Sequence, residues 1–388
     1  MIAGHYQVQA QERVTFGVPC AEAVVAELNR LGARKAFVTS TNSLANSSDG
    51  PLQKIIAALG PTHVGTYSTI RAHSPREDVI AIARAARAAQ ADILVAVGGG
   101  SVIDATKAAL ICLWHGLTSA AEMDPYRMGQ TDQSKRVIAP DYAIRMITVS
   151  TTLSASEFTA QAGVTDTNIH AKQSFTHRLC VPQAVILDPA ATLNTPQWLL
   201  FCTGIRAVDH AVESFCSPLA NLATEAGSLQ GLRLLARALP AIKKDPHDLT
   251  ARLDAQFGMW QSITASAAGV PMGASHGIGY VLGGSYGVAH GHTSCVMLPA
   301  VLEWNSVVNH SRQRELAAAM NQPSGKPSEL IRSLIRELDQ PTTLREVGIK
   351  RSDFEAIATQ ALGYGPVKKN PRPVQSKEAV LEILELAW

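Results

Sequence analysis

The chain has 388 residues, a length that favours two domains with substantial cores. Its 34 basic and 32 acidic residues give a formal net charge of +2, and no run of lysines or arginines is present, so we expect no nucleic-acid partner. The six cysteines lack CxxC spacing, so we expect reduced thiols. The N-terminus lacks a signal-peptide pattern, and no apolar stretch reaches the ~20 residues that span a bilayer. We therefore expect a cytoplasmic location and no membrane partner.

Short runs rich in β-branched and apolar residues alternate with helical stretches over the first half of the chain, which predicts parallel strands joined by crossover helices. The predicted strands are residues 13–17, 35–40, 63–68, 92–98, 142–149 and 184–189. The predicted helices between them are residues 20–32, 75–90 and 101–114. We therefore expect an α/β, Rossmann-like nucleotide-binding domain at residues 1–189.

The pattern changes near residue 190, beyond which alanine- and leucine-rich helical stretches dominate and few strand-like runs occur. We place the domain boundary there and expect an all-α substrate and catalytic domain at residues 190–388. The segment 116–141 has weak periodicity and two prolines, so it is predicted to be a long surface connection.

A predicted strand-to-helix junction at residues 92–110 carries three consecutive glycines, Gly98, Gly99 and Gly100, followed by Ser101. Glycines let backbone N–H groups approach a ligand closely, and the N-terminus of the next helix favours an anion, so a pyrophosphate can bind there. The pattern is neither the GxGxxG fingerprint nor a P-loop. A tight turn that binds nothing accounts for the same residues, so the glycines alone leave both interpretations open.

Asp104 and Lys107 follow Ser101 on the same predicted helix, and the resulting GGGSxxDxxK pattern resembles the start of the nicotinamide cofactor site in the iron-containing alcohol dehydrogenase superfamily. Further segments that resemble this superfamily are STTLSASEFT at 150–159, VILDP at 185–189 and the stretches at 203–217 and 275–305. The resemblance covers most of residues 13–305 in the right order. It implies the dehydroquinate synthase-like fold, in which an all-α domain follows an α/β cofactor domain.

By that resemblance the pyrophosphate of NAD(H) or NADP(H) would lie on the glycine turn. The residues that it implicates in cofactor binding are Gly98, Gly99, Gly100, Ser101, Asp104, Thr151, Thr152, Ser154 and Lys172. After the second strand many relatives carry an aspartate that binds the adenosine ribose, whereas this chain has Ser40, Thr41 and Asn42. No carboxylate there repels a 2′-phosphate, so Ser40 and Asn42 are compatible with NADPH as well as NADH, and ordinary turn residues would look the same.

Three histidines, His210, His276 and His290, match metal ligands of the metal-dependent relatives. In those relatives a D-A-x-x-H motif places Asp and His at i and i+4 on one helix face, where both bind the ion. The matching pair here is Arg206 and His210, so a cation replaces the carboxylate. A divalent ion and a guanidinium about 6 Å apart repel by roughly 5 kcal/mol at an effective dielectric of ~20. Three histidines can hold zinc, so iron or zinc stays an open alternative to the favoured metal-free site.

Maleylacetate reductases are the branch that this arrangement most resembles, because they also lack the aspartate and are regarded as working without metal. The stretch LGGSYGVAH at 282–290 is similar to their LGGxFGLPH. Two positions differ, since that branch has Asn at the position of Arg206 and the superfamily often has His at that of Tyr280. Asp209 cannot replace the lost ligand, because adjacent helix positions point about 100° apart, so we expect it to pair with Arg206 or a neighbouring base.

Hydride delivery to a carbonyl builds negative charge on oxygen, which a preorganised cation or hydrogen-bond donor must stabilise. Arg206 is a candidate for that role, or for a bidentate contact with a substrate carboxylate. The predicted catalytic residues are Arg206, His210, His276, Tyr280 and His290. Tyr280, His276, His290 and the neighbouring His292 are the candidates to supply the proton, and simple aromatic packing is the alternative role of Tyr280.

We therefore expect an NAD(P)H-dependent reductase of a small oxo-acid such as maleylacetate, with its active site in the cleft between the domains. The resemblance further implies a role in aromatic compound catabolism and a homodimer. One alternative is an iron- or zinc-dependent alcohol dehydrogenase or aldehyde reductase that tolerates Arg206. The other is a catalytically degenerate homologue that binds the nucleotide without turnover.

Overall fold

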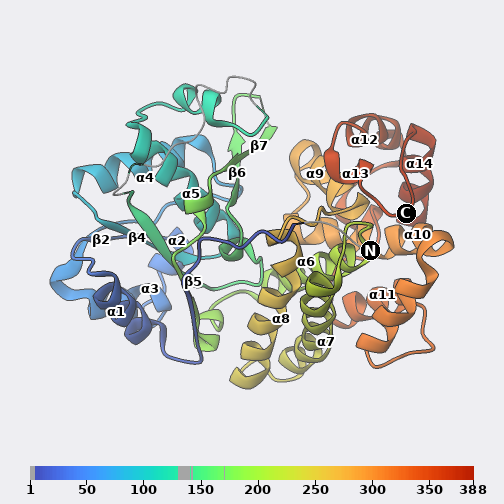
Figure 1. Cartoon of the computed structure of the whole chain (residues 1–388), viewed down its shortest axis with the longest axis horizontal. Helices are drawn as coiled ribbons and strands as arrows, with labels where there is room; N and C mark the ends of the chain where they lie inside the picture. Colours follow the sequence, from blue (N-terminus) through green and yellow to red (C-terminus); the bar gives the residue numbers. More distant parts are fainter. Residues whose placement is uncertain (1–4, 130–139, 141–142, 170) are drawn as a thin grey trace. The chain divides into compact units, whose positions relative to one another are not determined.

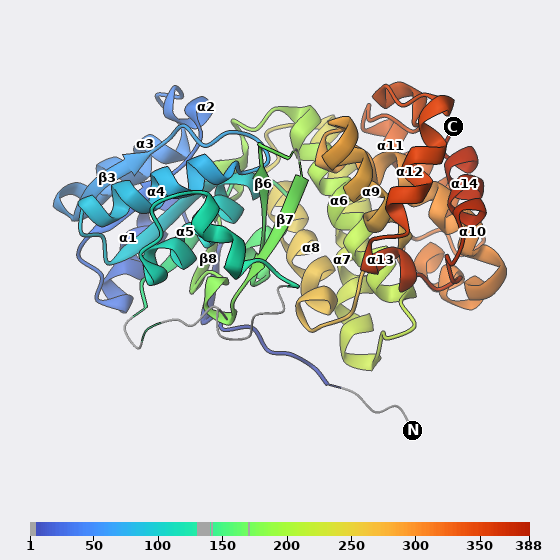
Figure 2. The same cartoon turned by 90° about the horizontal axis from the view of Figure 1, so that it is seen from above.

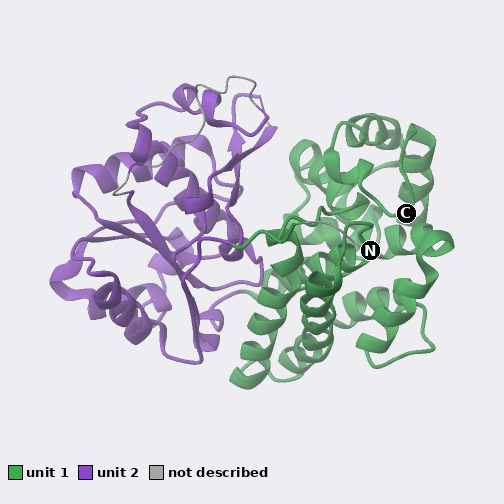
Figure 3. Cartoon of the chain, viewed as in Figure 1, with its two compact units in different colours: residues 1–8, 196–388 green, residues 9–195 purple. Residues whose placement is uncertain are grey.

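The computed structural model describes residues 5–129, 140, 143–169 and 171–388. The chain divides into two compact units, Gln9–Thr195 and Pro196–Trp388, and the second also includes the described part of residues 1–8 (Figure 3). This division lies a few residues beyond the predicted boundary. Parts of two predicted segments, the connection 116–141 and the strand 142–149, lie outside the described residues.

The first unit is built on a sheet of six parallel strands in the order β1-β8-β5-β4-β2-β3 (Figure 1). These strands are β1 (Arg13–Phe16), β2 (Ala36–Thr39), β3 (His63–Tyr67), β4 (Ile93–Gly98), β5 (Arg145–Ser150) and β8 (Ala184–Leu187). The helices are α1 (Cys20–Leu31), α2 (Asn42–Ala45), α3 (Pro51–Leu59), α4 (Arg76–Ala88) and α5 (Gly100–His115). The six predicted strands and three predicted helices are present. The sequence did not predict α2 and α3, because four and nine residues are too few for a helical period to stand out.

Side chains of the central strand β4 alternate between two cores. Leu94 and Ala96 pack with α4 and α5, whereas Val95 and Val97 pack with α1 and α3. Figure 1 shows these two pairs of helices on opposite sides of the sheet. Because both faces of the strand are covered, its sequence is an almost unbroken apolar run rather than an alternating one.

The strand order reverses next to β2. This strand has β3 on one side and β4 on the other, so the chain passes over β2 after it leaves β3. In open α/β sheets, ligands bind outside the carboxyl ends of the strands at such a switch point. The glycine turn after β4 and Ser40 after β2 lie at this edge of the sheet.

A two-stranded antiparallel hairpin, β6 (Gln161–Asp166) and β7 (Ala171–Thr176), was not predicted from the sequence (Figure 2). Its inward side chains Ala162, Val164 and Phe175 join the core formed by α4 and α5. An isolated hairpin is only marginally stable, so this one depends on packing against the helices. Its few apolar residues gave no clear alternating pattern in the sequence.

The described residues of the second unit form helices and connecting loops and no strand, as predicted. Its helices are α6 (Gln197–Cys216), α7 (Leu222–Lys244), α8 (Leu249–Ala267), α9 (Ala274–Tyr286), α10 (His290–Ala319), α11 (Pro327–Glu337), α12 (Phe354–Ala361), α13 (Gly365–Lys368) and α14 (Lys377–Leu386). Every residue of α6 from Gly204 to Cys216 is buried, so this helix presents its polar side chains to the protein interior. Within the described chain, no helix has both the length and the apolar character needed to cross a membrane.

Candidate active site

The turn between β4 and α5 leaves little room for a side chain at three consecutive positions. A Cβ atom at Gly98 would lie 2.6 Å from Cγ2 of Val102, and one at Gly99 would lie 2.7 Å from Cγ2 of Thr152. A Cβ atom at Gly100 would lie 3.1 Å from the Oγ atom of Ser154. The glycines therefore let Thr152 and Ser154 pack directly on the turn, and they leave main-chain N–H groups at the start of α5 able to meet an anion.

Two hydroxyl groups beside this turn lack a hydrogen-bond partner among the described residues. Oγ1 of Thr152 and Oγ of Ser154 are buried, and neither makes a hydrogen bond to any residue that the structure describes. Leaving a buried hydroxyl unpaired costs about 1–3 kcal/mol, which a ligand oxygen can recover. The three glycines, the helix N-terminus and the two hydroxyls therefore fit the pyrophosphate of a dinucleotide.

Ser101 and Thr151 support the same turn through main-chain contacts. The Oγ atom of Ser101 accepts a hydrogen bond from N of His73 at 3.1 Å, and its carbonyl accepts one from Oγ of Ser74 at 2.8 Å. N of Thr151 donates to the carbonyl of Gly98 at 3.1 Å. These bonds join the loops that follow three different strands, so the geometry of the turn is fixed from several directions.

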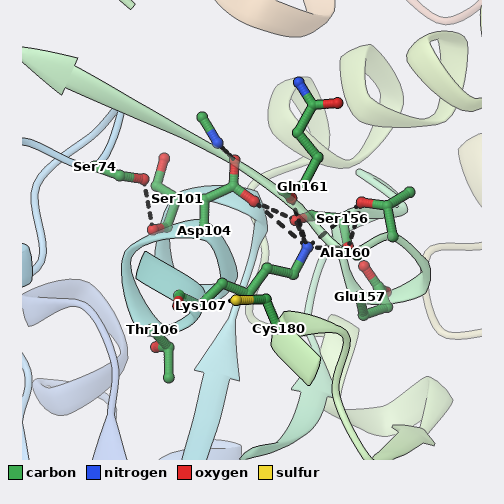
Figure 4. Close-up of polar contacts among 12 residues, drawn as sticks. Ser74, Ser101, Asp104, Thr106, Lys107, Ser156, Glu157, Ala160, Gln161 and Cys180 are labelled. Atoms are coloured by element: carbon green, nitrogen blue, oxygen red, sulfur yellow. Dashed lines mark hydrogen bonds and ion pairs between the residues drawn. The ribbon is translucent and has the colours of Figure 1, made fainter. Parts of the chain in front are cut away.

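Asp104 and Lys107 attach the hairpin to α5 (Figure 4). Nζ of the buried Lys107 donates to the carbonyls of Ser156 at 2.6 Å and Gln161 at 3.0 Å. Oδ2 of Asp104 accepts a hydrogen bond from N of Gly163 at 2.9 Å, and Oδ1 accepts one from the Ser156 hydroxyl. Burial lowers the pKa of Lys107, and the Asp104 carboxylate opposes that shift. Both residues therefore hold Ser156 and strand β6 against α5.

The other predicted cofactor residues, Lys172, Ser40 and Asn42, differ in their surroundings. A Cβ atom at Gly163 would be 2.3 Å from Cε of Lys172 and 3.5 Å from Oδ2 of Asp104, so the Lys172 stem crosses the hairpin beside that carboxylate. Ser40 is buried, and its hydroxyl donates to the carbonyl of Val97 at 2.8 Å. Asn42 is exposed in the first turn of α2. Ser40 and Asn42 both follow β2, and of these two residues Asn42 is the exposed one.

In the helical unit, Arg206 lies in a buried polar cluster. Its side chain is 4% exposed, and Nη1 donates to Oγ of Ser294 on α10 at 2.9 Å. Ser294 in turn donates to Oδ2 of Asp209 at 2.6 Å, and this oxygen is 4.0 Å from Nη1 of Arg206. Asp209 therefore pairs with Arg206, as expected. Their Coulomb attraction is about 4 kcal/mol at an effective dielectric of ~20, which offsets part of the cost of burying both charges.

His276, in the first turn of α9, faces two carboxylates of α6. Its Nδ1 atom lies 2.8 Å from Oε2 of Glu213 and 3.4 Å from Oδ2 of Asp209. Glu213 also accepts hydrogen bonds from main-chain N–H groups of Gly273, Ser275 and His276, so its carboxylate caps the N-terminus of α9. The hydroxyl of Ser275 donates to Asp209 at 2.8 Å.

Several atoms of this cluster have no partner among the described residues. They are Nε of Arg206, Oδ1 of Asp209, Nδ1 of His210 and Nε2 of His276. The rings of His210 and His276 are 5.0 Å apart between centroids, so these unpaired atoms belong to one polar region. Such groups are rare in protein interiors, and their concentration on α6 and α9 makes this cluster a candidate ligand site.

The remaining predicted residues are less closely associated with the cluster of Arg206, His210 and His276. The ring of the partly buried Tyr280 is 6.4 Å from that of His276 and 5.7 Å from that of Tyr364. His290 is partly buried at the first position of α10. His292 lies 6.0 Å from the ring of Trp198. The structure thus brings Arg206, His210 and His276 together, with Tyr280 beside them.

Burial controls the protonation of the cluster. It lowers the pKa of His276 to about 3, and the charge of Arg206 acts in the same direction. It also lowers the pKa of His210 well below its ordinary value. It raises the pKa of Glu213 to about 7 and that of Asp209 above its ordinary range. Both imidazoles are therefore neutral near neutral pH, and each has one donor and one acceptor nitrogen.

The donor atoms do not fit a metal centre in this arrangement. Across the described residues, the one group whose donor atoms all lie within 4.8 Å of one another is Asp209, Glu213 and His276, so His210 and His290 do not join it. The 2.8 Å between His276 and Glu213 is shorter than the ~3.3 Å expected between two ligands of tetrahedral zinc, so it is a hydrogen bond rather than a shared ion. The three-histidine metal site stays a prediction.

Sequence reasoning missed Glu213, Ser275 and Ser294 as members of the site. Glu213 follows Arg206 by seven residues on α6 and therefore lies on the same helix face as Arg206 and His210. That spacing was available in the sequence. The two serines gave no signal, because their contacts with Asp209 depend on how α9 and α10 pack against α6.

Comparisons with known proteins agree with this geometry. Residues 11–189 match the family described as iron-containing alcohol dehydrogenase, and residues 201–388 match the C-terminal domain of the Fe-containing alcohol dehydrogenase family. Dehydrogenase FUM7 of Gibberella moniliformis is 32% identical and is covered over 100% of both chains. Maleylacetate reductase 2 of Cupriavidus pinatubonensis is 30% identical, with 97% of this chain and 94% of the relative covered.

Solved structures show the same relationship. Maleylacetate reductase from Agrobacterium tumefaciens superposes with a TM-score of 0.83 at 27% identity, with 100% of this chain and 99% of the other covered. A 1,3-propanediol oxidoreductase superposes with a TM-score of 0.89 at 26% identity, with 99% of this chain and 100% of the other covered. The chain therefore belongs to the iron-containing alcohol dehydrogenase family, as an NAD(P)-dependent oxidoreductase of its maleylacetate reductase-like branch.

Proposed function

We propose that the chain is an NAD(P)H-dependent reductase of a small oxo-acid such as maleylacetate, and that it works without a resident metal. The observation that carries this proposal is the buried guanidinium of Arg206 beside two neutral histidines that each have an unpaired ring nitrogen. A cation at this point stabilises negative charge on a substrate oxygen, or binds a substrate carboxylate through two N–H groups. The similarity to maleylacetate reductases supports the same substrate class.

The cofactor assignment rests on the glycine turn. Gly99, Gly100, Thr152 and Ser154 would bind the pyrophosphate, because the two hydroxyls otherwise lack a partner among the described residues. When bound, the nicotinamide supplies the hydride. Asn42 would face the adenosine ribose, and an uncharged amide there accepts either NADH or NADPH.

Within the helical unit, each polar residue has a proposed role. Arg206 would orient the substrate and stabilise the charge that develops on its oxygen. Nε2 of His276 or Nδ1 of His210 would exchange the proton, since both are buried and unpaired in the described structure. Tyr280 would close one side of the site, and burial raises the pKa of its hydroxyl, which keeps it protonated.

An iron- or zinc-dependent alcohol dehydrogenase is the second candidate. It is favoured by one observation, the group of Asp209, Glu213 and His276 whose donor atoms lie within 4.8 Å of one another, where an ion would have to replace the hydrogen bond between His276 and Glu213. It also agrees with the similarity to 1,3-propanediol oxidoreductase. The two candidates differ in the metal that they require and in the substrate that they turn over.

A substrate screen with NADH and NADPH, run with and without added metal, tests the proposal. We expect turnover of oxo-acids that survives chelation, and elemental analysis of the purified protein should give iron and zinc far below one per chain. Stoichiometric metal with chelator-sensitive alcohol oxidation would overturn the proposal in favour of the second candidate. Nicotinamide binding without turnover of oxo-acids, aldehydes or alcohols would instead identify a degenerate homologue.

A further inference from the structure

We propose that Glu213 and Asp209 are positioning residues, which hold the proton of His276 at Nδ1 and so make Nε2 the nitrogen that exchanges a proton with the substrate. This inference rests on the proposed function and names its proton-exchanging atom. It goes beyond the proposed function by giving a role to two carboxylates that do not touch the reacting atoms. Both would act through His276.

The first argument is the asymmetry of the His276 ring. Nδ1 lies 2.8 Å from one carboxylate oxygen and 3.4 Å from another, on Glu213 and Asp209. Once ionised, the two carboxylates are only acceptors, so the ring nitrogen that faces them is then the donor. Nε2 is buried and meets no partner within the described chain, which leaves its lone pair for a ligand.

The second argument is that neither carboxylate is free to turn away. Glu213 accepts three main-chain N–H groups at the start of α9, at 2.7, 2.8 and 3.3 Å. Oδ2 of Asp209 accepts the hydroxyls of Ser275 and Ser294 at 2.8 and 2.6 Å. The acceptors are therefore preorganised, and the tautomer of His276 is imposed by α6 rather than chosen by the substrate.

The assignment balances the reaction. In the reductive direction Nε2 of His276 first takes up a proton from solvent, while Nδ1 keeps its own. The carbonyl carbon would then accept hydride from a bound nicotinamide and the carbonyl oxygen would accept the Nε2 proton, which returns the imidazole to its neutral form with the proton on Nδ1. In the oxidative direction the alcohol returns its proton to Nε2 and its hydride to the oxidised cofactor. The Nδ1 proton stays with the carboxylates in both directions, as it does in catalytic triads.

A purely structural role for Glu213 is the competing explanation, because its carboxylate also caps α9. Loss of that cap would lower stability and activity together without any preference between the ring nitrogens. The position of the imidazole proton therefore separates the two explanations, whereas activity alone does not. Asp209 helps to separate the two explanations, because it faces Nδ1 of His276 but does not cap α9. Among the described residues it accepts no main-chain N–H group of that helix.

The experiment is 15N NMR of full-length protein labelled at histidine, recorded at about pH 8.5 and assigned with a His276→Gln variant. At that pH Glu213, whose pKa burial raises to about 7, is ionised. Wild type is compared with Glu213→Gln and Asp209→Asn. Glu225→Gln is the matched control, because it removes a carboxylate of the same unit that pairs with Arg312 at 2.6 Å.

We expect the wild-type proton on Nδ1, and a mixture of both tautomers in Glu213→Gln and Asp209→Asn. Their kcat for the oxo-acid should fall roughly 10- to 100-fold while the Kd for NADH stays unchanged, and Glu225→Gln should match wild type. A wild-type proton on Nε2, or unchanged tautomers in both variants, would overturn the inference. The wild-type spectrum decides even if a variant fails to fold. Because it needs no substrate, correct tautomers with no oxo-acid turnover would reject the proposed function alone.

Discussion

Replacing Gly99 by alanine tests the cofactor site most directly, because the new methyl group has a single defined obstacle. Its Cβ atom would lie 2.7 Å from Cγ2 and 2.9 Å from Oγ1 of Thr152, whereas carbon atoms normally approach to about 3.5–4.0 Å. The overlap is therefore about 1 Å, and Thr152 is buried and cannot simply swing into solvent. Overpacking of this kind costs typically ~1–3 kcal/mol, through strain in the folded state or displacement of the turn.

We expect Gly99→Ala to raise the Kd for NADH, followed by fluorescence titration, at least roughly tenfold, or ~1.4 kcal/mol. The urea midpoint of unfolding should also fall. Adding Thr152→Ser removes the obstructing methyl group and should recover part of both losses, which a double-mutant cycle measures. Gly284→Ala is the control, since its methyl group meets nothing within 4 Å on α9 and should stabilise the helix by about 0.5–1 kcal/mol. Wild-type affinity in Gly99→Ala, or zero coupling with Thr152→Ser, would refute this account of the turn.

Three further predictions concern charge. Arg206→Ala should lower kcat/KM for the oxo-acid at least roughly tenfold, or ~1.4 kcal/mol. Arg206→Lys should be intermediate, because it keeps the charge but not the planar pair of N–H donors. Unchanged kinetics would remove Arg206 from the mechanism. Lys107→Met leaves the carbonyls of Ser156 and Gln161 without this donor and should lower the free energy of unfolding by roughly 2–3 kcal/mol. The exposed Lys54→Met is the control and should be neutral, and equal urea midpoints for the two variants would contradict the anchoring role of Lys107. Burial moves the pKa of His276 from 6.5 to about 3 and that of Glu213 from 4.5 to about 7. Between pH 4.5 and 6.5 the unfolded state holds one proton on this pair, on His276, and the folded state also holds one, on Glu213. In this range the pair therefore adds no pH dependence to the free energy of unfolding. Glu213→Gln leaves the shift of His276 uncompensated, so its stability should fall relative to wild type by ~1.4 kcal/mol for each pH unit between about 6.5 and 4.5. Below about pH 4.5 both proteins should lose stability at the same rate. Parallel urea-unfolding profiles between pH 6.5 and 4.5 would contradict the pairing.

The α/β unit was largely predictable because its signals are local. The run that forms β4 is buried on both faces and ends at Gly98, and Gly99 and Gly100 follow it without a gap. The hairpin of β6 and β7 was missed because its stability comes from packing against α5 rather than from its own sequence pattern. Asp104 illustrates the same limit, since its attachment to the hairpin could not be seen without that element.

The sequence by itself placed Arg206 and His210 on one face of one helix, because residues four apart in an α-helix are neighbours whatever surrounds them. It also predicted that His276 and the glycine turn belong to the functional sites. Only the tertiary structure decided that Glu213 and Asp209 meet Nδ1 of His276, since this contact joins α6 to α9 across more than sixty residues of sequence. The periodicity of a helix is a local property, whereas the choice of partner for a buried charge depends on which helices pack together and on the absence of water to compete for it.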